Sequence, residues 1–158
     1  MKKVGSRAWR KDSSGQTQVE FALTIIFVLF LIFGLIELVL YIYTYSVMAD
    51  SAKEGVRYAI VHGVNASAPS GPTCPCPAID GAPGTGVVKT YAQFSFHDTS
   101  AMTVNVVYNP DTDAVCPTPF NSAPCAVRVT VSYPYSPLLG FGGPTVTLNA
   151  AAEGRIVF

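Results

Sequence analysis

Net charge is the first thing that this sequence lacks. Its 158 residues contain ten Lys and Arg against ten Asp and Glu, and only 13% of them are charged. Five of the ten basic residues lie within residues 1–15, whereas residues 16–158 hold five basic and nine acidic side chains. A nucleic-acid-binding protein needs a broad basic surface. The basic residues here form only a short N-terminal cap, which excludes nucleic acid as a partner.

Charge is almost absent from Phe21 to Ile42, which reads FALTIIFVLFLIFGLIELVLYI with Glu37 as its only charged residue. At 1.5 Å per residue, these 22 residues are long enough to span a hydrocarbon core of about 30 Å. A signal peptide has a shorter apolar core of about 7 to 15 residues, so we expect a transmembrane helix. Basic residues precede the run and no comparable cluster follows it, which places the N-terminus in the cytoplasm. The tyrosines at its far end fit an aromatic belt at the outer interface: Tyr41, Tyr43 and Tyr45.

The helical pattern continues through residues 46–63. One face of this segment is an apolar stripe formed by Met48, Ala52, Val56, Ala59 and Ile60. The opposite face is charged and is formed by Asp50, Lys53, Glu54 and Arg57. We predict one helix from about Thr17 to His62, weakly interrupted by Gly55 and ended by Gly63.

The remaining sequence predicts a loop, a short helix and a small sheet. Residues 63–86 are rich in Gly, Pro, Ala and Ser and predict a loop without regular structure. A short amphipathic helix is predicted by the spacing of Val87, Val88, Tyr91 and Phe94. Apolar and polar residues alternate at 103–108, 127–133 and 145–149, which predicts three strands with one apolar face each. We therefore predict an α+β fold, in which a long N-terminal helix spans the membrane with its first half and packs its outer half against a small antiparallel sheet.

The sequence also lacks the patterns of catalytic sites. His62 and His97 have no Ser or Cys at a spacing that suggests a nucleophile, and there is no Gly-rich phosphate-binding loop. Asp111 and Asp113 show a fragment of calcium-loop spacing, without the glycine and the terminal glutamate that such a loop needs. We predict that the protein is not an enzyme and that it binds no cofactor or metal.

Cysteine is scarce, with Cys74, Cys76, Cys116 and Cys125. An even number in a segment predicted to lie outside the membrane suggests disulfides. A bond between Cys74 and Cys76 would close a very small, strained ring. Either Cys116 pairs with Cys125 and another bond is long-range or intermolecular, or two bonds join the 74/76 loop to Cys116 and Cys125. A metal site at Cys-Pro-Cys is the rival interpretation, which the oxidising compartment and the lack of a nearby histidine disfavour.

Gly15 follows the basic leader and precedes Gln-Thr-Gln-Val-Glu-Phe, so that Glu20 is the fifth residue after it. This order resembles the processing site of type IV pilin-like proteins, in which a prepilin peptidase cuts after the glycine and the carboxylate at the fifth mature position is retained. The pair Glu20 and Phe21 resembles the tight-adherence (Flp) subclass. The resemblance implies cleavage between Gly15 and Gln16.

Two further segments resemble the TadE family of pseudopilins. SAKEGVRYA, residues 51–59, is similar to the small-x-x-Glu-Gly-x-Arg-x-Ala segment of that family, which makes Glu54, Gly55 and Arg57 candidates for helix assembly. VRVTVSYPYSPLLG, residues 127–140, is similar to the strand and Pro-Leu loop of its periplasmic part. The resemblance implies a type IV pilin-like organisation: a leader at 1–15 that is removed, an assembly helix at 16–62, and a periplasmic or extracellular part at 63–158.

The resemblance also implies a structural role in assembling a tight-adherence type IV pilus. The expected partners are a prepilin peptidase, other pilin or pseudopilin subunits, the inner-membrane assembly platform and the lipid bilayer. The expected location is the inner (cytoplasmic) membrane, crossed once, with the C-terminal part in the periplasm or in a filament. The alternative function is that of an uncleaved, single-pass membrane anchor that carries a periplasmic binding module.

Glu20 has two possible roles at the edge of the apolar run. A carboxylate in a low-dielectric setting is stabilised by a nearby cation, and cleavage after Gly15 would create an α-amino group at Gln16. If that amine belongs to a neighbouring subunit, Glu20 sets the axial register between helices. Glu20 can instead reach the headgroups by snorkelling. Its position after Gly15 and the basic leader favours the pairing role.

Overall fold

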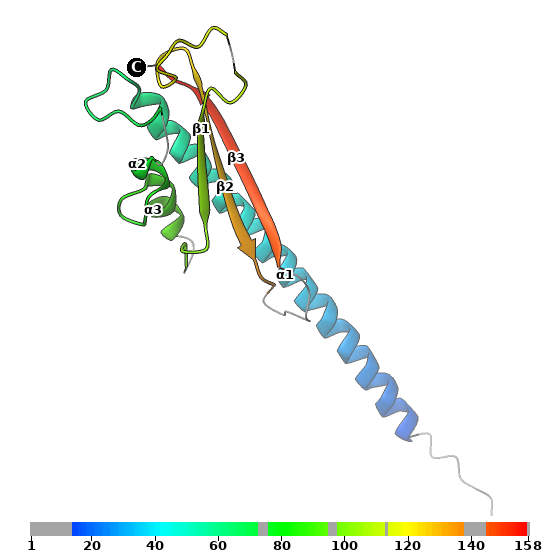
Figure 1. The fold of residues 1–158 in the computed structure, drawn as a ribbon. Coiled ribbons are helices and arrows are strands. Elements are labelled where there is room, and N and C mark those ends of the chain that lie inside the picture. The colour runs from blue at the N-terminus through cyan, green and yellow to red at the C-terminus, as the bar shows by residue number, and fades with distance from the viewer. Residues whose placement is uncertain (1–13, 73–75, 95–97, 113, 138–144, 158) are drawn as a thin grey trace, which may run out of the picture. The chain divides into compact units, whose positions relative to one another are not determined.

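The computed structural model describes residues 14–72, 76–94, 98–112, 114–137 and 145–157. The chain divides into two compact units, residues 1–38 and 39–158. The elements, shown in Figure 1, are helices α1 (Ser14–Val61), α2 (Pro77–Asp80) and α3 (Val87–Gln93) and strands β1 (Thr103–Tyr108), β2 (Ala126–Tyr135) and β3 (Val146–Arg155).

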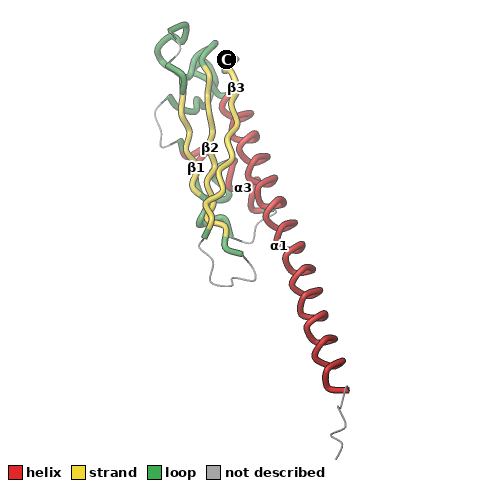
Figure 2. The backbone as a smooth tube through the Cα atoms, turned by 90° about the vertical axis from the view of Figure 1, so that its right-hand side faces the viewer, coloured by secondary structure: helices red, strands yellow, loops and turns green. Residues whose placement is uncertain are grey.

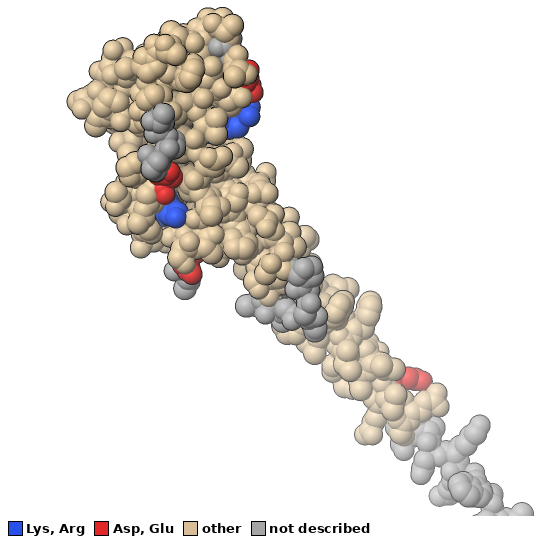
Figure 3. All heavy atoms as spheres, in the orientation of Figure 1, with Lys and Arg blue, Asp and Glu red and all other residues tan. Residues whose placement is uncertain are grey.

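The described part of the first unit is the first half of α1. No proline interrupts α1, and its apolar side chains up to Leu38 are exposed, among them large ones such as Phe21 and Phe33. By length and composition, α1 is able to cross a membrane. Charged side chains are scarce on the face of the molecule shown in Figure 3, where most described residues are tan, the colour of residues other than Lys, Arg, Asp and Glu. So much exposed apolar surface is unfavourable in water, so this segment needs lipid or other protein around it.

The second unit contains a three-stranded antiparallel sheet in the order β1-β2-β3. In the central strand, Val127, Val129 and Val131 are fully buried, while the side chains between them are half-buried. Figures 1 and 2 both show α1 running alongside this sheet. The predicted α+β fold is confirmed: the outer part of the long helix packs against a small antiparallel sheet.

The predicted stripe of α1 forms one side of the core. Met48, Ala52 and Ala59 are fully buried, Val56 is nearly so, and Ile60 packs at the edge. The facing strand β3 presents small residues: in its inward positions stand Ala150, Ala152 and Gly154. A Cβ atom at Gly154 would lie 2.7 Å from Cγ1 of Val56. The helix therefore approaches β3 more closely than any side chain there would allow.

Gly55 has a packing role that sequence reasoning missed. A Cβ atom at this position would lie 2.6 Å from Cγ2 of Val88, 3.2 Å from Cγ1 of Val129 and 3.4 Å from Cγ2 of Ile79. These three neighbours belong to α3, β2 and α2. The glycine is thus the point at which α1 meets three other elements, rather than only a weak interruption of the helix.

Three predictions about the elements need correction. The predicted loop 63–86 contains the short helix α2 at Pro77–Asp80, which begins with proline, a residue favoured in the first helical turn. The apolar stripe predicted for the short helix is wrong at Phe94, which follows α3 and is 88% exposed. Strand β3 is twice as long as predicted and reaches Arg155. Its Val146, which we predicted to lie on the buried apolar face, is exposed.

The C-terminal end of α1 is closed by later segments of the chain. The backbone N–H of Val157 donates to the Ile60 carbonyl at 3.1 Å. Ser70 donates to the His62 carbonyl twice, from its N–H at 2.8 Å and from its Oγ at 3.0 Å. The Tyr108 hydroxyl then donates to Ser70 Oγ at 3.1 Å. These bonds satisfy carbonyl groups that a helix end leaves without an intrahelical donor.

Candidate functional site

Gly15 and Gln16 lie in the first turn of α1, which begins at Ser14. Both are exposed, and a Cβ atom at Gly15 would have no other heavy atom within 4 Å. The predicted leader up to residue 13 lies outside the described residues. The peptide bond between Gly15 and Gln16 therefore lies at an exposed end of α1, within its first turn.

Glu20 lies one turn after Gln16 on the same side of α1. The amide Nε2 of Gln16 donates to Oε1 of Glu20 at 3.1 Å. The hydroxyl of Thr24 donates to the backbone carbonyl of Glu20 at 2.8 Å, so it leaves the carboxylate available. The sequence did not suggest Gln16 as a partner, although a Gln and an acid four residues apart on a helix are able to interact. Glu20 thus has a neutral hydrogen-bond donor within its own chain.

The three candidates of the SAKEGVRYA segment lie on two different sides of α1. Gly55 faces the core, whereas Glu54 and Arg57 face outward and form an exposed ion pair of 3.4 Å. Asp50 and Lys53 form a similar exposed pair of 3.0 Å one turn earlier. The structure therefore divides the segment between an inward packing position and an outward charged face.

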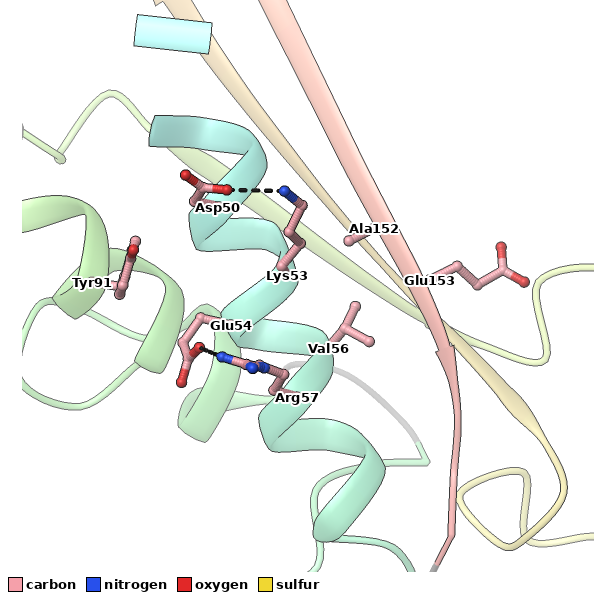
Figure 4. Close-up of a pocket in the computed structure, with 8 residues that line it drawn as sticks. All are labelled: Asp50, Lys53, Glu54, Val56, Arg57, Tyr91, Ala152 and Glu153. Atoms are coloured by element: carbon pink, nitrogen blue, oxygen red, sulfur yellow. Dashed lines mark hydrogen bonds and ion pairs between the residues drawn. The ribbon is translucent and has the colours of Figure 1, made fainter. Parts of the chain in front are cut away.

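The outward face lies in a shallow hollow of about 440 Å³. As Figure 4 shows, α1 contributes its charged residues to the lining, α3 contributes Tyr91, and β3 contributes Glu153. Both charge signs are present and alternate along α1. Such a surface suits contact with another protein that carries charges of both signs.

Arg128 joins two segments in a charge cluster that the sequence did not reveal. Its Nε donates to Glu153 at 2.9 Å across the β2–β3 ladder, and its guanidinium contacts Asp111 at 3.2 Å. The hydrogen bond to Glu153 raises the pKa of Arg128 above its ordinary value. The register of the two strands brings these side chains together, and no spacing within the sequence encodes that register.

The cysteine predictions are resolved in part. Cys116 and Cys125 form a disulfide with 4.8 Å between their Cα atoms, as the first arrangement predicted. The second arrangement, with bonds from the 74/76 loop to both of these residues, is wrong. Cys76 is also disulfide-bonded, and Cys74 lies outside the described residues.

The described histidine, His62, is not part of a metal-ligand cluster among the described residues. His62 stacks on Tyr58 with 3.8 Å between ring centroids, and its Nδ1 lies 2.9 Å from the Tyr58 carbonyl. His97 lies outside the described residues. In the described part of the chain, no three His, Cys, Asp or Glu side chains come together as metal ligands would.

Comparison with known protein families gives a match to the TadE-like protein family over residues 15–57. No curated protein and no solved structure matches the chain. The matched region begins at Gly15 and ends at Arg57, so it contains the candidate processing site, Glu20 and the SAKEGVRYA candidates. The resemblance that these motifs predict is confirmed, and residues 15–57 form a TadE-like segment.

Proposed function

We propose that this protein is a TadE-like pseudopilin that takes part in assembling a tight-adherence (Flp) type IV pilus, and that a prepilin peptidase cuts it after Gly15. The family match over residues 15–57 carries the proposal, because it coincides with α1 from its first turn to its packed part. The role is structural: α1 anchors the chain and makes subunit contacts, and it carries the sheet that packs on its second half.

The start of α1 supports the processing step. A peptidase must bind the backbone on both sides of the bond that it hydrolyses, and a side chain at Gly15 would stand in the way. The exposed position of Gly15 and the open space around its Cα meet this need. Hydrolysis would leave the α-amino group of Gln16 as a new cation.

The new amine gives Glu20 a charged partner in place of a neutral one. The Gln16 amide that now donates to Glu20 is a weak partner for a carboxylate in a low-dielectric environment, because hydrogen bonds from charged donors are roughly twice as strong. We propose that Glu20 pairs with the amine of a neighbouring subunit and so sets the axial register of the packed helices.

The proposed partners follow from two exposed regions of α1, the apolar first half and the charged outward face of the second half. The exposed apolar part contacts lipid before assembly and other pilin or pseudopilin helices afterwards. The exposed pairs Asp50–Lys53 and Glu54–Arg57 meet neighbouring subunits or the assembly platform. The proposed location is the inner membrane, with residues 63–158 on the periplasmic side.

The processing step is tested by intact mass measurement after co-expression with a prepilin peptidase. The parent chain should lose residues 1–15, and Gly15→Val should keep them. Gly34→Val is the matched control, because Gly34 also lies in α1 and its added side chain would meet nothing within 4 Å. A parent chain that keeps its leader would support the uncleaved anchor instead, and a Gly15→Val chain of mature mass would remove the proposed cleavage site.

The pairing role is tested by Glu20→Leu. We expect this variant to be cut and inserted normally, because the glycine and the basic leader are unchanged, but to lose crosslinking to its pilin partners and to abolish piliation. Gln16→Ala is the control: it removes the hydrogen bond within the chain but keeps the α-amine, so it should assemble. If Glu20→Leu assembles like the parent, Glu20 is only a snorkelling carboxylate.

A further inference from the structure

One end of the sheet is held at the level at which the apolar run of α1 ends. The rings of Tyr41 and Tyr135 meet edge to face, with 5.6 Å between their centroids. Tyr41 belongs to the last turn of the apolar run, which ends at Ile42, and Tyr135 is the last residue of β2. If the run reaches the boundary of a bilayer, this contact brings the end of β2 to the same boundary.

At this end, the described parts of β2, β3 and α1 carry no formal charge, and the nearest described carboxylate along the chain to the start of β1 is Asp98, five residues before Thr103. No Asp, Glu, Lys or Arg occurs in residues 129–137 or 145–152, nor in residues 38–49 of α1. The opposite end of the same two strands carries the cluster of Arg128, Glu153 and Asp111. Strands β2 and β3 are therefore polarised along their length, and their uncharged ends are the ones beside Tyr41.

The exposed side chains at this end suit the headgroup layer of a bilayer. Tyr43 is 50% exposed and Val146, which pairs with Tyr135 across the ladder, is 47% exposed. Tyrosine has an apolar ring and a polar tip, which is why it gathers at membrane interfaces. From Tyr41 to Tyr45 the helix rises about 6 Å. The headgroup layer on one side of a bilayer is about 5 to 7 Å thick, so the tyrosines span it.

We propose that the Tyr41–Tyr135 end of the sheet is a lipid-contacting surface that sits in the headgroup layer of the outer leaflet and fixes the sheet at one depth on the membrane. The site consists of the exposed tyrosines of α1 together with the ends of β2 and β3. It rests on α1 crossing the membrane, which is part of the proposed function.

The proposal is tested with single-tryptophan variants of the full chain in a Trp9→Phe background, since Trp9 is the only native tryptophan. The proteins are placed in vesicles of phosphatidylethanolamine and phosphatidylglycerol that carry a nitroxide either on the headgroup or midway along an acyl chain. Val146→Trp reports on the proposed surface, and Tyr135→Trp is a second reporter that keeps an aromatic ring in place. Phe120→Trp, in the loop before β2, reports on the charged end of the sheet, and Phe33→Trp reports on the apolar run.

We expect the headgroup nitroxide to quench Val146→Trp and Tyr135→Trp severalfold more than Phe120→Trp. The acyl-chain nitroxide should quench Phe33→Trp most strongly. If Phe33→Trp behaves in this way while the two sheet reporters are quenched no more than Phe120→Trp, the inference is overturned and the membrane span stands. If Phe33→Trp is not quenched by the acyl-chain nitroxide, both the span and the inference fail. If Val146→Trp is shielded from the headgroup nitroxide and also from acrylamide in the water, a second protein chain covers this end instead of lipid, and the inference is again wrong.

Discussion

The two halves of α1 differ in the size and the burial of their apolar side chains. Residues 21–38 are mostly large, apolar and exposed, whereas residues 47–60 bury small residues such as Ala52, Gly55 and Ala59. The large apolar side chains of the first half are exposed, so surroundings that suit them must come from outside the chain. The second half has a partner of its own, and small residues let the sheet come close. The most hydrophobic part of this helix is therefore its least buried part.

The largest expected effect comes from Gly55→Val, which attacks the packed half at the junction of α1, α2, α3 and β2. The added side chain would overlap Val88 and Val129, which are fully buried and cannot move aside easily. We expect a loss of about 3 kcal/mol in the free energy of unfolding. The measurement is denaturant unfolding of the full chain in detergent. Gly34→Val, in the exposed half, should stay within about 0.5 kcal/mol of the parent, and equal losses in both variants would erase the difference between the halves.

A smaller loss in the free energy of unfolding is expected at the C-terminal end of α1, where Ser70 and Tyr108 form hydrogen bonds. Tyr108→Phe removes the hydrogen bond to Ser70 and should cost about 1 kcal/mol at neutral pH. Burial raises the pKa of Tyr108 above its ordinary value, and the bond to Ser70 only partly opposes this. The advantage of the parent is therefore complete below about pH 10, where tyrosine in the unfolded chain is still protonated, and is lost as the pH rises through the raised folded pKa. Unfolding curves of both proteins across this range test the prediction, and a parent advantage that grew with pH would contradict it.

The smallest effect on stability is expected on the outward face of the packed half. Arg57 is 77% exposed, so its ion pair with Glu54 should contribute less than about 0.5 kcal/mol in a double-mutant cycle with Glu54→Ala and Arg57→Ala. If these residues contact neighbouring subunits, the same variants should reduce crosslinking to pilin partners while the unfolding midpoint stays unchanged. A coupling above about 2 kcal/mol would instead place the pair among the groups that hold the fold together.

The long helix and the sheet were predictable because their patterns are local. The buried stripe through Met48, Ala52 and Val56 follows from helical spacing, and the alternation of β2 follows from a period of two. The second half of β3 was not predictable. Its residues 149–154 are mostly Ala and Gly, which rarely indicate a strand. They form one here because the close approach of α1 requires small side chains.

The candidate site was predictable to different degrees at its two ends. Gly15 and Glu20 were singled out because their order resembles a known processing site; both lie exposed at the start of α1, and their roles stay predictions. The spacing within SAKEGVRYA suggested one motif, but the helix turns Gly55 inward and Glu54 outward. The contacts of Gly55 with Val88 and Val129 depend on how distant elements pack, so no pattern within the segment could reveal them.

The bond from Val157 to the Ile60 carbonyl has a consequence for the order in which the protein is made. Because a chain is synthesised from its N-terminus, α1 is complete long before residues 146–157 emerge. During that interval the small-residue stripe of α1 is uncovered and the end of the helix lacks the donor that Val157 provides. Folding of residues 39–158 therefore finishes only when β3 arrives, and until then the incomplete chain exposes its stripe to any chaperone or neighbouring chain.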